Sequence, residues 1–298
     1  MAGRPNYIVH APGYDPDSGG SIFLHELVNA LNQLGESAFL WPMNWTRPET
    51  MAERVRAVLR RPSLLWRLPS LRTNPALNPR VARNRDLPPD SIVVYPEVTL
   101  GNPLGARNVV RWLLYRPGLK DPYRFGPDEM FFRAGEMSDL PELTGGAPEL
   151  FLWRINPAYR NLANPDRGGA CYAVRKGAGK PRIAETRGAI PIDGLSHEEI
   201  ADIFNRCSVF YSYDEATFYS QYAAICGCLS VVVPGLYSSR EEWVASHPIA
   251  RYGVAYGLDD LDHARQTQDQ VLGLLQAKQD SGMASVRAFV TATMARFR

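Results

Sequence analysis

The chain has 298 residues, a length that suits two α/β domains of about 150 residues each. Hydrophobic residues make up 45% and charged residues 21%, which supports packed cores and excludes general disorder. The formal net charge of +2 is too small to indicate nucleic-acid binding, and no segment is apolar over the roughly 18 residues that a membrane-spanning helix needs.

The N-terminal half is predicted to begin as a Rossmann-like domain. A strand over residues 7–10 leads into a Gly-, Asp- and Pro-rich loop over residues 11–20, and then into a helix that ends at Gly35. Further strands are expected at residues 38–41, 91–95 and 109–114. The succession of strand, glycine loop, helix and strand predicts an α/β domain over residues 1–165.

The C-terminal half alternates strands and helices more regularly, after a joint of turn-forming residues at 156–169. Ser196 and Glu199 form a capping-box sequence at the start of a helix. Strands are expected at residues 171–174, 209–212 and 229–233, and helices at 218–226, 259–278 and 284–297. This pattern predicts a second doubly wound domain over residues 166–298; whether its last helix packs back on the N-terminal domain stays open.

The cysteines and histidines lack the spacing of metal or redox motifs. The four cysteines include a C-x-C pair, at 226 and 228, and the five histidines are scattered. We therefore expect reduced thiols in a cytoplasmic protein and no structural metal. The N-terminal residues do not resemble a secretory signal peptide, which favours the same compartment.

The first candidate site lies where the first strand meets the first helix. Gly19 and Gly20 precede that helix, so backbone N–H groups there are able to approach an anionic ligand. The loop is not G-x-G-x-x-G, which argues against a nicotinamide or flavin cofactor. His10 ends the preceding strand and is a candidate catalytic residue, with a purely structural role as the alternative.

Two further sites follow strands of the C-terminal half. Arg175, Lys176 and Lys180 stand among glycines after residues 171–174, a composition that suits a diphosphate, although a solvated basic turn is the alternative. Asp214 and Glu215 follow residues 209–212, where carboxylates are able to hold sugar hydroxyls; the alternative is that they only favour the next helix. The same segment includes Tyr213 and Thr217, and Thr217 is a candidate cap.

The segment 208–234 resembles the donor site of GT-B glycosyltransferases, in particular the large retaining group that uses nucleotide-sugar donors. It contains a strand, an acidic loop, a helix that ends in Ile225-Cys226-Gly227, and a strand of valines at 231–233. The resemblance implies two Rossmann-like doubly wound domains facing a central cleft. It also implies a donor on the C-terminal domain, an acceptor on the N-terminal one, and no bound metal or other cofactor.

The resemblance also implies roles for individual residues. Asp214 matches the acid that contacts the donor sugar, and Arg175 and Lys180 resemble the basic pair on its diphosphate, with Lys176 as a substitute. Tyr222 stands where the family has a second acid that holds the ribose. Together with Tyr213, Glu215, Thr217, Gly19 and Gly20, these residues form the predicted donor-binding set.

On the acceptor side, Glu97 ends a predicted strand and is a candidate base or orienting group for an acceptor hydroxyl. Residues 54–85 contain nine arginines and no acid between them, interleaved with leucines. This mixture favours peripheral contact with an anionic membrane or a lipid-linked acceptor over nucleic acid. An ordinary amphipathic helix with solvated arginines is the alternative.

These observations predict a cytoplasmic enzyme, which is peripheral on the inner face of the membrane if the arginine-rich segment binds there. It would be a hexosyltransferase that moves a sugar from a UDP- or GDP-sugar to a glycan or lipid-linked acceptor, without metal, in bacterial surface polysaccharide synthesis. Two alternatives stay open. One is a catalytically silent GT-B-like protein that binds a glycan or a partner, and the other is a nucleotide-sugar enzyme such as an epimerase.

Overall fold

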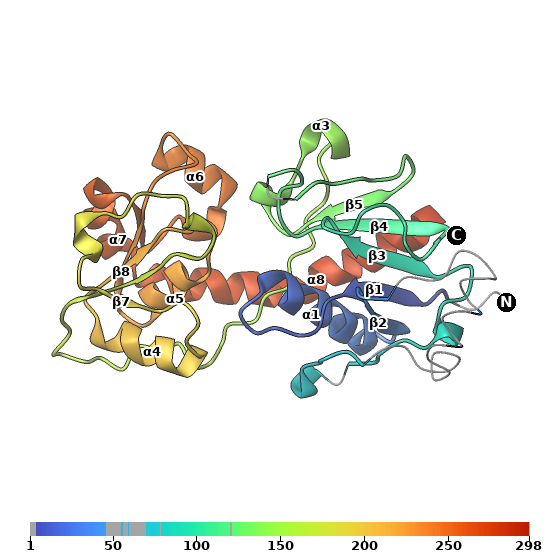
Figure 1. The fold of residues 1–298 in the computed structure, drawn as a ribbon, viewed down its shortest axis with the longest axis horizontal. Coiled ribbons are helices and arrows are strands. Elements are labelled where there is room, and N and C mark those ends of the chain that lie inside the picture. Colours follow the sequence, from blue (N-terminus) through green and yellow to red (C-terminus); the bar gives the residue numbers. More distant parts are fainter. Residues whose placement is uncertain are drawn as a thin grey trace. The chain divides into compact units, whose positions relative to one another are not determined.

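The chain folds into two compact α/β units. The computed structural model describes residues 4–45, 55, 59, 70–77, 79–119 and 121–297. One unit comprises Met1–Trp153 with Asp280–Arg298, and the other comprises Arg154–Gln279. The chain returns to the first unit within α8 (Gln270–Phe297), the long C-terminal helix drawn in red in Figure 1.

The first unit is built on a parallel five-stranded sheet with the order β2-β1-β3-β4-β5. The strands are β1 (Tyr7–Ala11), β2 (Ala38–Pro42), β3 (Ile92–Pro96), β4 (Asn108–Leu113) and β5 (Met130–Arg133). The order reverses between β1 and β3, so the loops after these two strands diverge to opposite sides of the sheet. Such a switch point is where doubly wound folds bind ligands, at the carboxyl ends of the strands.

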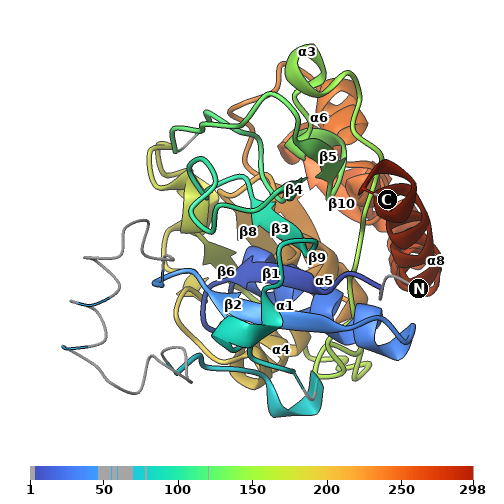
Figure 2. The same ribbon diagram turned by 90° about the vertical axis from the view of Figure 1, so that its right-hand side faces the viewer.

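One face of this sheet is covered by helices. α1 (Gly19–Gln33) packs Phe23 against Trp112, and α8 packs Phe289 against Tyr7 and Phe132. The C-terminal end of α8 lies beside the strands in Figure 2. The opposite face, with Ile8, Val93 and Tyr95, packs against residues of loops such as Leu87 and Leu104. A short helix, α3 (Pro141–Thr144), follows β5.

The second unit repeats the strand order of the first. Its parallel sheet runs β10-β9-β8-β6-β7, with the switch between β6 and β8. The strands are β6 (Ala170–Ala173), β7 (Ile190–Pro191), β8 (Val209–Ser212), β9 (Leu229–Val232) and β10 (Val254–Tyr256). The predicted α/β class with two Rossmann-like units is confirmed.

Helices cover both faces of the second sheet. α4 (His197–Arg206) packs Phe204 on Phe210, and α6 (Arg240–Ser246) packs Trp243 near Val232 and Tyr256. α7 (Leu261–Thr267) packs on the other face, and α5 (Tyr219–Ile225) joins β8 to β9. The capping box predicted at Ser196 and Glu199 is present and starts α4.

The chain ends in two helical segments as predicted, but the break between them lies at residues 268–269 and not at 279–283. α8 is continuous through Gly282, where a gap was expected. A Cβ at Gly282 would meet Leu152 and the carbonyl of Phe151 at 3.4 Å, and Ser285 donates to that same carbonyl. These contacts hold the helix on residues 151–152, so a glycine that favours a break in isolation lies within a continuous helix.

Within the described ranges, none of the helices combines the length and the apolar character required to cross a bilayer.

Candidate functional site

The main candidate site of the second unit lies at the switch point, where the loops after β6 and β8 meet. The first loop begins with a short 3₁₀ turn, Arg175–Gly177. An added Cβ at Gly177 would lie 2.0 Å from the carbonyl oxygen of Tyr213, so only glycine allows this approach. Because Gly177 has no side chain, the basic loop after β6 packs directly against the acidic loop after β8.

Arg175 and Asp214 form an ion pair across the two loops. Arg175 Nε lies 3.9 Å from Asp214 Oδ2, and its guanidinium lies 5.0 Å from the centroid of the Tyr219 ring. The arginine side chain is 28% exposed and the aspartate side chain 4%. Arg175 also has a φ of +43°, a left-handed conformation that costs a non-glycine residue about 1–2 kcal/mol. Such strain is typical of functional loops, and Lys176 beside it is exposed.

Asp214 is held in place from its own loop. Its Oδ1 accepts from the Ala216 backbone N–H at 3.0 Å, an Asx turn, and its carbonyl accepts from the Ser212 hydroxyl at 2.7 Å. The remaining carboxylate oxygen is the one that faces Arg175. A ligand hydroxyl at this strand end would therefore meet an acceptor of fixed orientation.

Glu215, the neighbouring acid, joins the strand-end loops of the unit. Its carboxylate accepts from Gly235 N at 3.0 Å, Leu236 N at 3.1 Å, the Tyr256 hydroxyl at 2.8 Å and Lys180 Nζ at 3.0 Å. These donors follow β9, end β10 and follow β6. Burial, and then the hydrogen bond to Glu215, raise the pKa of Tyr256 to about 12. Protein donors therefore take up most of the acceptor capacity of this predicted sugar-binding acid.

Lys180, the second predicted basic residue, is anchored in the same network. Besides Glu215, its ammonium donates to the Val233 carbonyl at 2.6 Å, and the side chain is 16% exposed. A Cβ at Gly235 would lie 2.4 Å from Lys180 Cε, so glycine makes room for this side chain. The basic residues thus divide into an anchored Lys180 and the more exposed Arg175 and Lys176.

Tyr213 and Thr217 shape the loop after β8. The buried Tyr213 hydroxyl accepts from Ile183 N at 3.0 Å and lies 2.8 Å from the Thr186 hydroxyl. Thr217 Oγ1 accepts from Tyr219 N at 3.3 Å. The helix begins at Tyr219, so Thr217 lies one residue before the N-cap position, which Phe218 occupies. Both predicted residues are close to Asp214 in sequence, and the contacts of their hydroxyls are internal.

Tyr222, at the position of the family's second acid, is buried. Its ring stacks on Tyr159 with centroids 4.0 Å apart and an interplanar angle of 6°. Tyr159 in turn contacts His197 and Phe204. The position that would hold the ribose in the family is here part of an aromatic cluster.

His247 is a residue of this region that the sequence did not single out. It follows α6, and its Nδ1 lies 3.2 Å from the Trp243 carbonyl. Burial lowers the pKa of His247; the carboxylates of Glu215 and Asp214 act in the opposite direction and Lys176 in the same one. These charges mark the histidine as a neighbour of the two acids. No motif spacing signals this, because the proximity depends on where α6 packs.

In the first unit, His10 and Glu97 lie at the carboxyl ends of β1 and β3, the strands that flank its switch point. Burial, followed by the charge of Arg111, lowers the pKa of His10 to about 4, so the ring is neutral at pH 7. Its Nδ1 lies 3.2 Å from the Thr99 hydroxyl, and its buried Nε2 has no hydrogen-bond partner in the described part of the chain.

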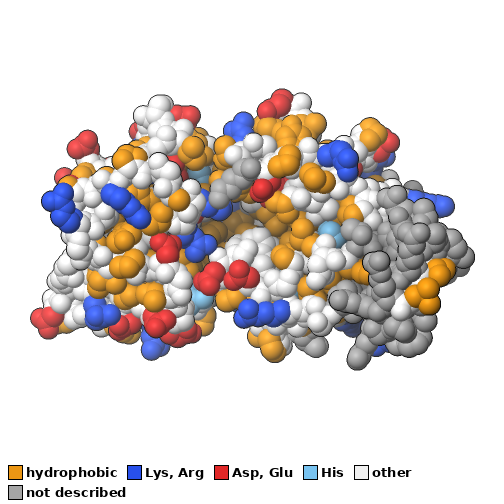
Figure 3. All heavy atoms as spheres, in the orientation of Figure 1, with side chains coloured by type: hydrophobic (Ala, Val, Ile, Leu, Met, Phe, Trp, Pro, Cys, Tyr) orange, Lys and Arg blue, Asp and Glu red, His pale blue; other side chains and the backbone are white. Residues whose placement is uncertain are grey.

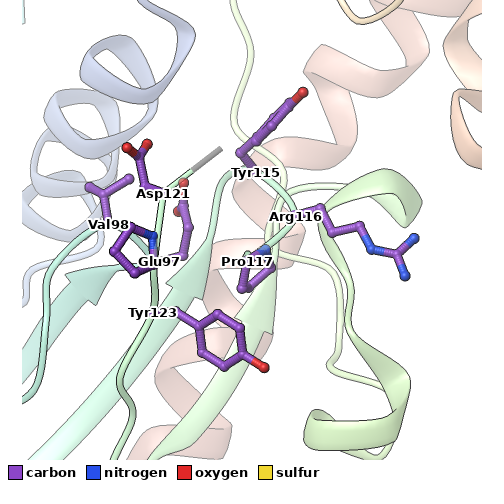
Figure 4. A pocket seen from close by; sticks show the side chains of 8 residues that line it. Glu97, Val98, Tyr115, Arg116, Pro117, Asp121 and Tyr123 are labelled. Atoms are coloured by element: carbon purple, nitrogen blue, oxygen red, sulfur yellow. The ribbon is translucent and has the colours of Figure 1, made fainter. Parts of the chain in front are cut away.

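Glu97 lies in a small pocket between the loops after β3 and β4. The carboxylate is buried and accepts from Leu114 N at 2.9 Å. Figure 4 shows the surrounding side chains, which are Val98, Tyr115, Arg116, Pro117, Asp121, Pro122 and Tyr123. This is a buried carboxylate among both apolar and polar side chains, at the place where a base or an orienting group for an acceptor hydroxyl was predicted.

Gly19 and Gly20 are the first residues of α1, whose N-cap Ser18 accepts from Ser21 N. An added Cβ at Gly19 would meet nothing within 4 Å, and one at Gly20 only Leu114 at 3.6 Å. Neither glycine is required by local packing. Their contact with a donor stays a prediction.

The described part of the chain gives little indication of a metal ion or of a membrane as a partner. No group of His, Cys, Asp or Glu side chains in the described ranges has the arrangement of a metal site. Acidic and basic side chains are interspersed over the face of the second unit seen in Figure 3. Within the predicted membrane contact, residues 54–85, positions 54, 56–58, 60–69 and 78 lie outside the described residues, and they include five of the nine arginines.

Comparison with known proteins gives likenesses to solved structures only. No protein family and no curated protein matches the chain. A solved structure described as the crystal structure analysis of the glycotransferase of kitacinnamycin aligns with 99% of this chain and 96% of its own, at 10% identity and a TM-score of 0.40. At that level the likeness bears on neither activity nor substrate, and the fold assignment rests on the two strand orders.

Proposed function

We propose that the chain is a GT-B-type glycosyltransferase of the hexosyltransferase kind, which takes a sugar from a UDP- or GDP-sugar. The observation that carries the proposal is the pairing of Arg175 with the buried Asp214 at the switch point of the second unit. In doubly wound folds this strand end is the ligand site. There, Arg175 would provide a cation for a diphosphate, and Asp214 would provide a carboxylate of fixed orientation for a sugar.

The chemistry follows from these charges. Asp214 would accept hydrogen bonds from sugar hydroxyls, while Arg175 and Lys176 would lie along the diphosphate. As the bond between the anomeric carbon and the diphosphate breaks, negative charge grows on the leaving group, and fixed cations stabilise that charge. Arg175 and Lys176 would thus do what a metal ion does elsewhere. Glu97 would receive the proton of the acceptor hydroxyl.

The proposal also includes an acceptor, a pathway and a cellular location. The acceptor would be a glycan or a lipid-linked molecule, and the reaction a step of bacterial surface polysaccharide synthesis in the cytoplasm. The arginine-rich segment 54–85 would hold the enzyme at the anionic inner face of the membrane. These statements rest on the sequence resemblance and on the composition of that segment.

A second candidate is a catalytically silent protein that binds a nucleotide sugar or a glycan. Tyr222 favours it, because the position of the ribose-binding acid is filled by a ring stacked on Tyr159. An epimerase on the same scaffold has no observation of its own in its favour.

A thermal-shift screen against nucleotides and nucleotide sugars tests the main proposal. Stabilisation by UDP, GDP or one of their sugars is expected, and Arg175→Met should abolish it, whereas Arg187→Met, on an exposed residue of the same unit, should not. Release of free nucleotide from a stabilising sugar donor would then separate an enzyme from a silent binder. If no nucleotide shifts the melting temperature, the proposed function is wrong.

A further inference from the structure

Exposed apolar side chains gather on two loops of the first unit. Val98, Leu100, Leu119 and Tyr123 are each between 42% and 47% exposed, and they lie on the loops that follow β3 and β4. The loops contact each other, since Gly101 N donates to the Arg124 carbonyl at 2.8 Å. Single exposed apolar residues are ordinary, but several on adjoining loops at a sheet's carboxyl edge indicate a binding surface.

The loop after β3 is held firmly in this arrangement. Arg111 is fully buried on β4 and donates to the carbonyls of Pro96, Thr99 and Gly101 at 2.7–3.3 Å. The same guanidinium makes two hydrogen bonds to Glu129, at 2.7 and 2.8 Å. Val98 and Leu100 are therefore displayed by a fixed backbone, so their exposure is a feature of the folded loop.

The pocket beside these side chains accepts only a small chemical group. The enclosed space has room for about one water-sized group, which is the size of a single hydroxyl and far smaller than a whole ligand. Buried Glu97 and the wall residues Pro117 and Tyr123 would surround one end of a molecule. The rest of that molecule would extend over the exposed aliphatic side chains.

The chemistry of the surface selects among acceptors. A glycan presents hydroxyls on most sides, and the aliphatic chains of Val98, Leu100 and Leu119 offer those hydroxyls no partner. An anionic end group would meet the carboxylates of Glu97 and Asp121. Arg116 extends away from the pocket in Figure 4, and the guanidinium of Arg124 lies against Gly101 on the neighbouring loop.

We propose that this pocket receives the hydroxyl of an apolar acceptor, an alcohol or phenol whose body lies over Val98, Leu100 and Leu119. The inference rests on the proposed transferase function and replaces its glycan or lipid-linked acceptor with an apolar one. In the transfer, the acceptor O–H proton passes to Glu97 and the acceptor oxygen bonds to the anomeric carbon. The bond from that carbon to the diphosphate breaks, and its electron pair leaves with the nucleoside diphosphate.

Acceptor binding measured without any donor tests the inference separately from the enzyme activity. The probe is 1-naphthol, with methyl glucoside as the polar comparison, and binding is followed by titration calorimetry. Leu100→Ser combined with Leu119→Ser should weaken naphthol binding by about tenfold, which corresponds to partial loss of two aliphatic contacts. Leu143→Ser, on a leucine of the same unit that is 44% exposed on α3, should leave it unchanged.

The outcomes separate the two proposals. Naphthol binding that exceeds methyl glucoside binding and falls only in the loop variant supports an apolar binding surface, and together with a positive nucleotide screen it supports the apolar acceptor. Equal binding of both probes, or an equal loss in the Leu143 variant, overturns it. A positive nucleotide screen would in that case leave the proposed transferase intact with a different acceptor.

Discussion

Replacement of Glu215 by glutamine tests whether this acid holds the donor-site loops together. The glutamine has the same shape but carries no charge. Its amide nitrogen is a hydrogen-bond donor, and it would face groups that are themselves donors. Those donors are Lys180 Nζ, the Tyr256 hydroxyl and the backbone N–H groups of Gly235 and Leu236, all within 3.1 Å of the carboxylate. The variant therefore loses either the hydrogen bonds of Lys180 and Leu236 N to Oε2 or those of Gly235 N, Leu236 N and the Tyr256 hydroxyl to Oε1, and in both cases the ion pair with Lys180.

The size of the effect follows from burial. Loss of one partner from a buried ion pair costs about 3–5 kcal/mol, and Lys180, at 16% exposure, keeps some contact with solvent and the Val233 carbonyl. We therefore expect the lower end, about 3 kcal/mol. For a unit of this size that lowers the melting temperature by roughly 10 °C.

The assay is a thermal melt followed by circular dichroism, with Glu185→Gln as the control. Glu185 is an exposed acid of the same unit, so its loss should cost less than about 0.5 kcal/mol. Lys180→Met and the double variant complete a cycle that isolates the coupling between the two charges. If Glu215→Gln melts at the same temperature as Glu185→Gln, the acid does not hold the loops, and its assignment to the donor sugar gains ground.

Three further predictions concern single positions in the two units. Gly177→Ala should abolish nucleotide stabilisation and lower the melting temperature, because its Cβ would collide with the Tyr213 carbonyl. Gly179→Ala, where a Cβ meets nothing within 4 Å, should behave as wild type. Equal behaviour of the two variants would contradict the packing argument. Asp214→Asn should keep the Asx turn and the fold but lower the rate of nucleotide release from the sugar donor by about 100-fold, as expected when one fixed charge is lost from an active site; an unchanged rate would remove Asp214 from the site. The pKa of His10 falls from 6.5 to about 4 on folding, so its contribution to stability is complete above pH 6.5 and is lost as the pH falls towards 4, by about 3 kcal/mol in all. Urea denaturation should therefore show a smaller loss of unfolding free energy between pH 7 and pH 4 for His10→Gln than for wild type, and identical slopes would refute the buried neutral ring.

Local sequence patterns predicted most of the regular elements. β8 has the predicted bounds, and β1, β2, β3, β4, β6 and β9 differ from prediction by one residue at one or both ends. Three strands were missed. β7 has two residues, β10 has three between Gly253 and Gly257, and β5 follows a loop with many prolines and glycines, so none of these segments shows a clear period of two.

The location of the candidate site could be predicted from the sequence, but the different roles of Asp214 and Glu215 within it could not. A basic loop and an acidic loop after successive strands indicate a shared edge, because the carboxyl ends of parallel strands meet there. Nothing local distinguishes Asp214 from Glu215, however. Glu215 is fixed by Tyr256, Gly235 and Leu236, which lie 20 to 41 residues further along the chain. His247 was missed for the same reason, since its position depends on how α6 packs.

Under the proposed function, the two units would use one strand order for two different chemistries. In the second unit the switch point carries Arg175 and Lys176 over the carboxylate of Asp214, an arrangement for a polar and highly charged ligand. In the first unit the same edge carries Glu97 with exposed aliphatic side chains, which would suit the apolar acceptor proposed above. The sheets themselves supply neither property. The difference comes from the loops, because a parallel sheet fixes only where those loops start, and each loop's charge and apolar content then decide which substrate its unit binds.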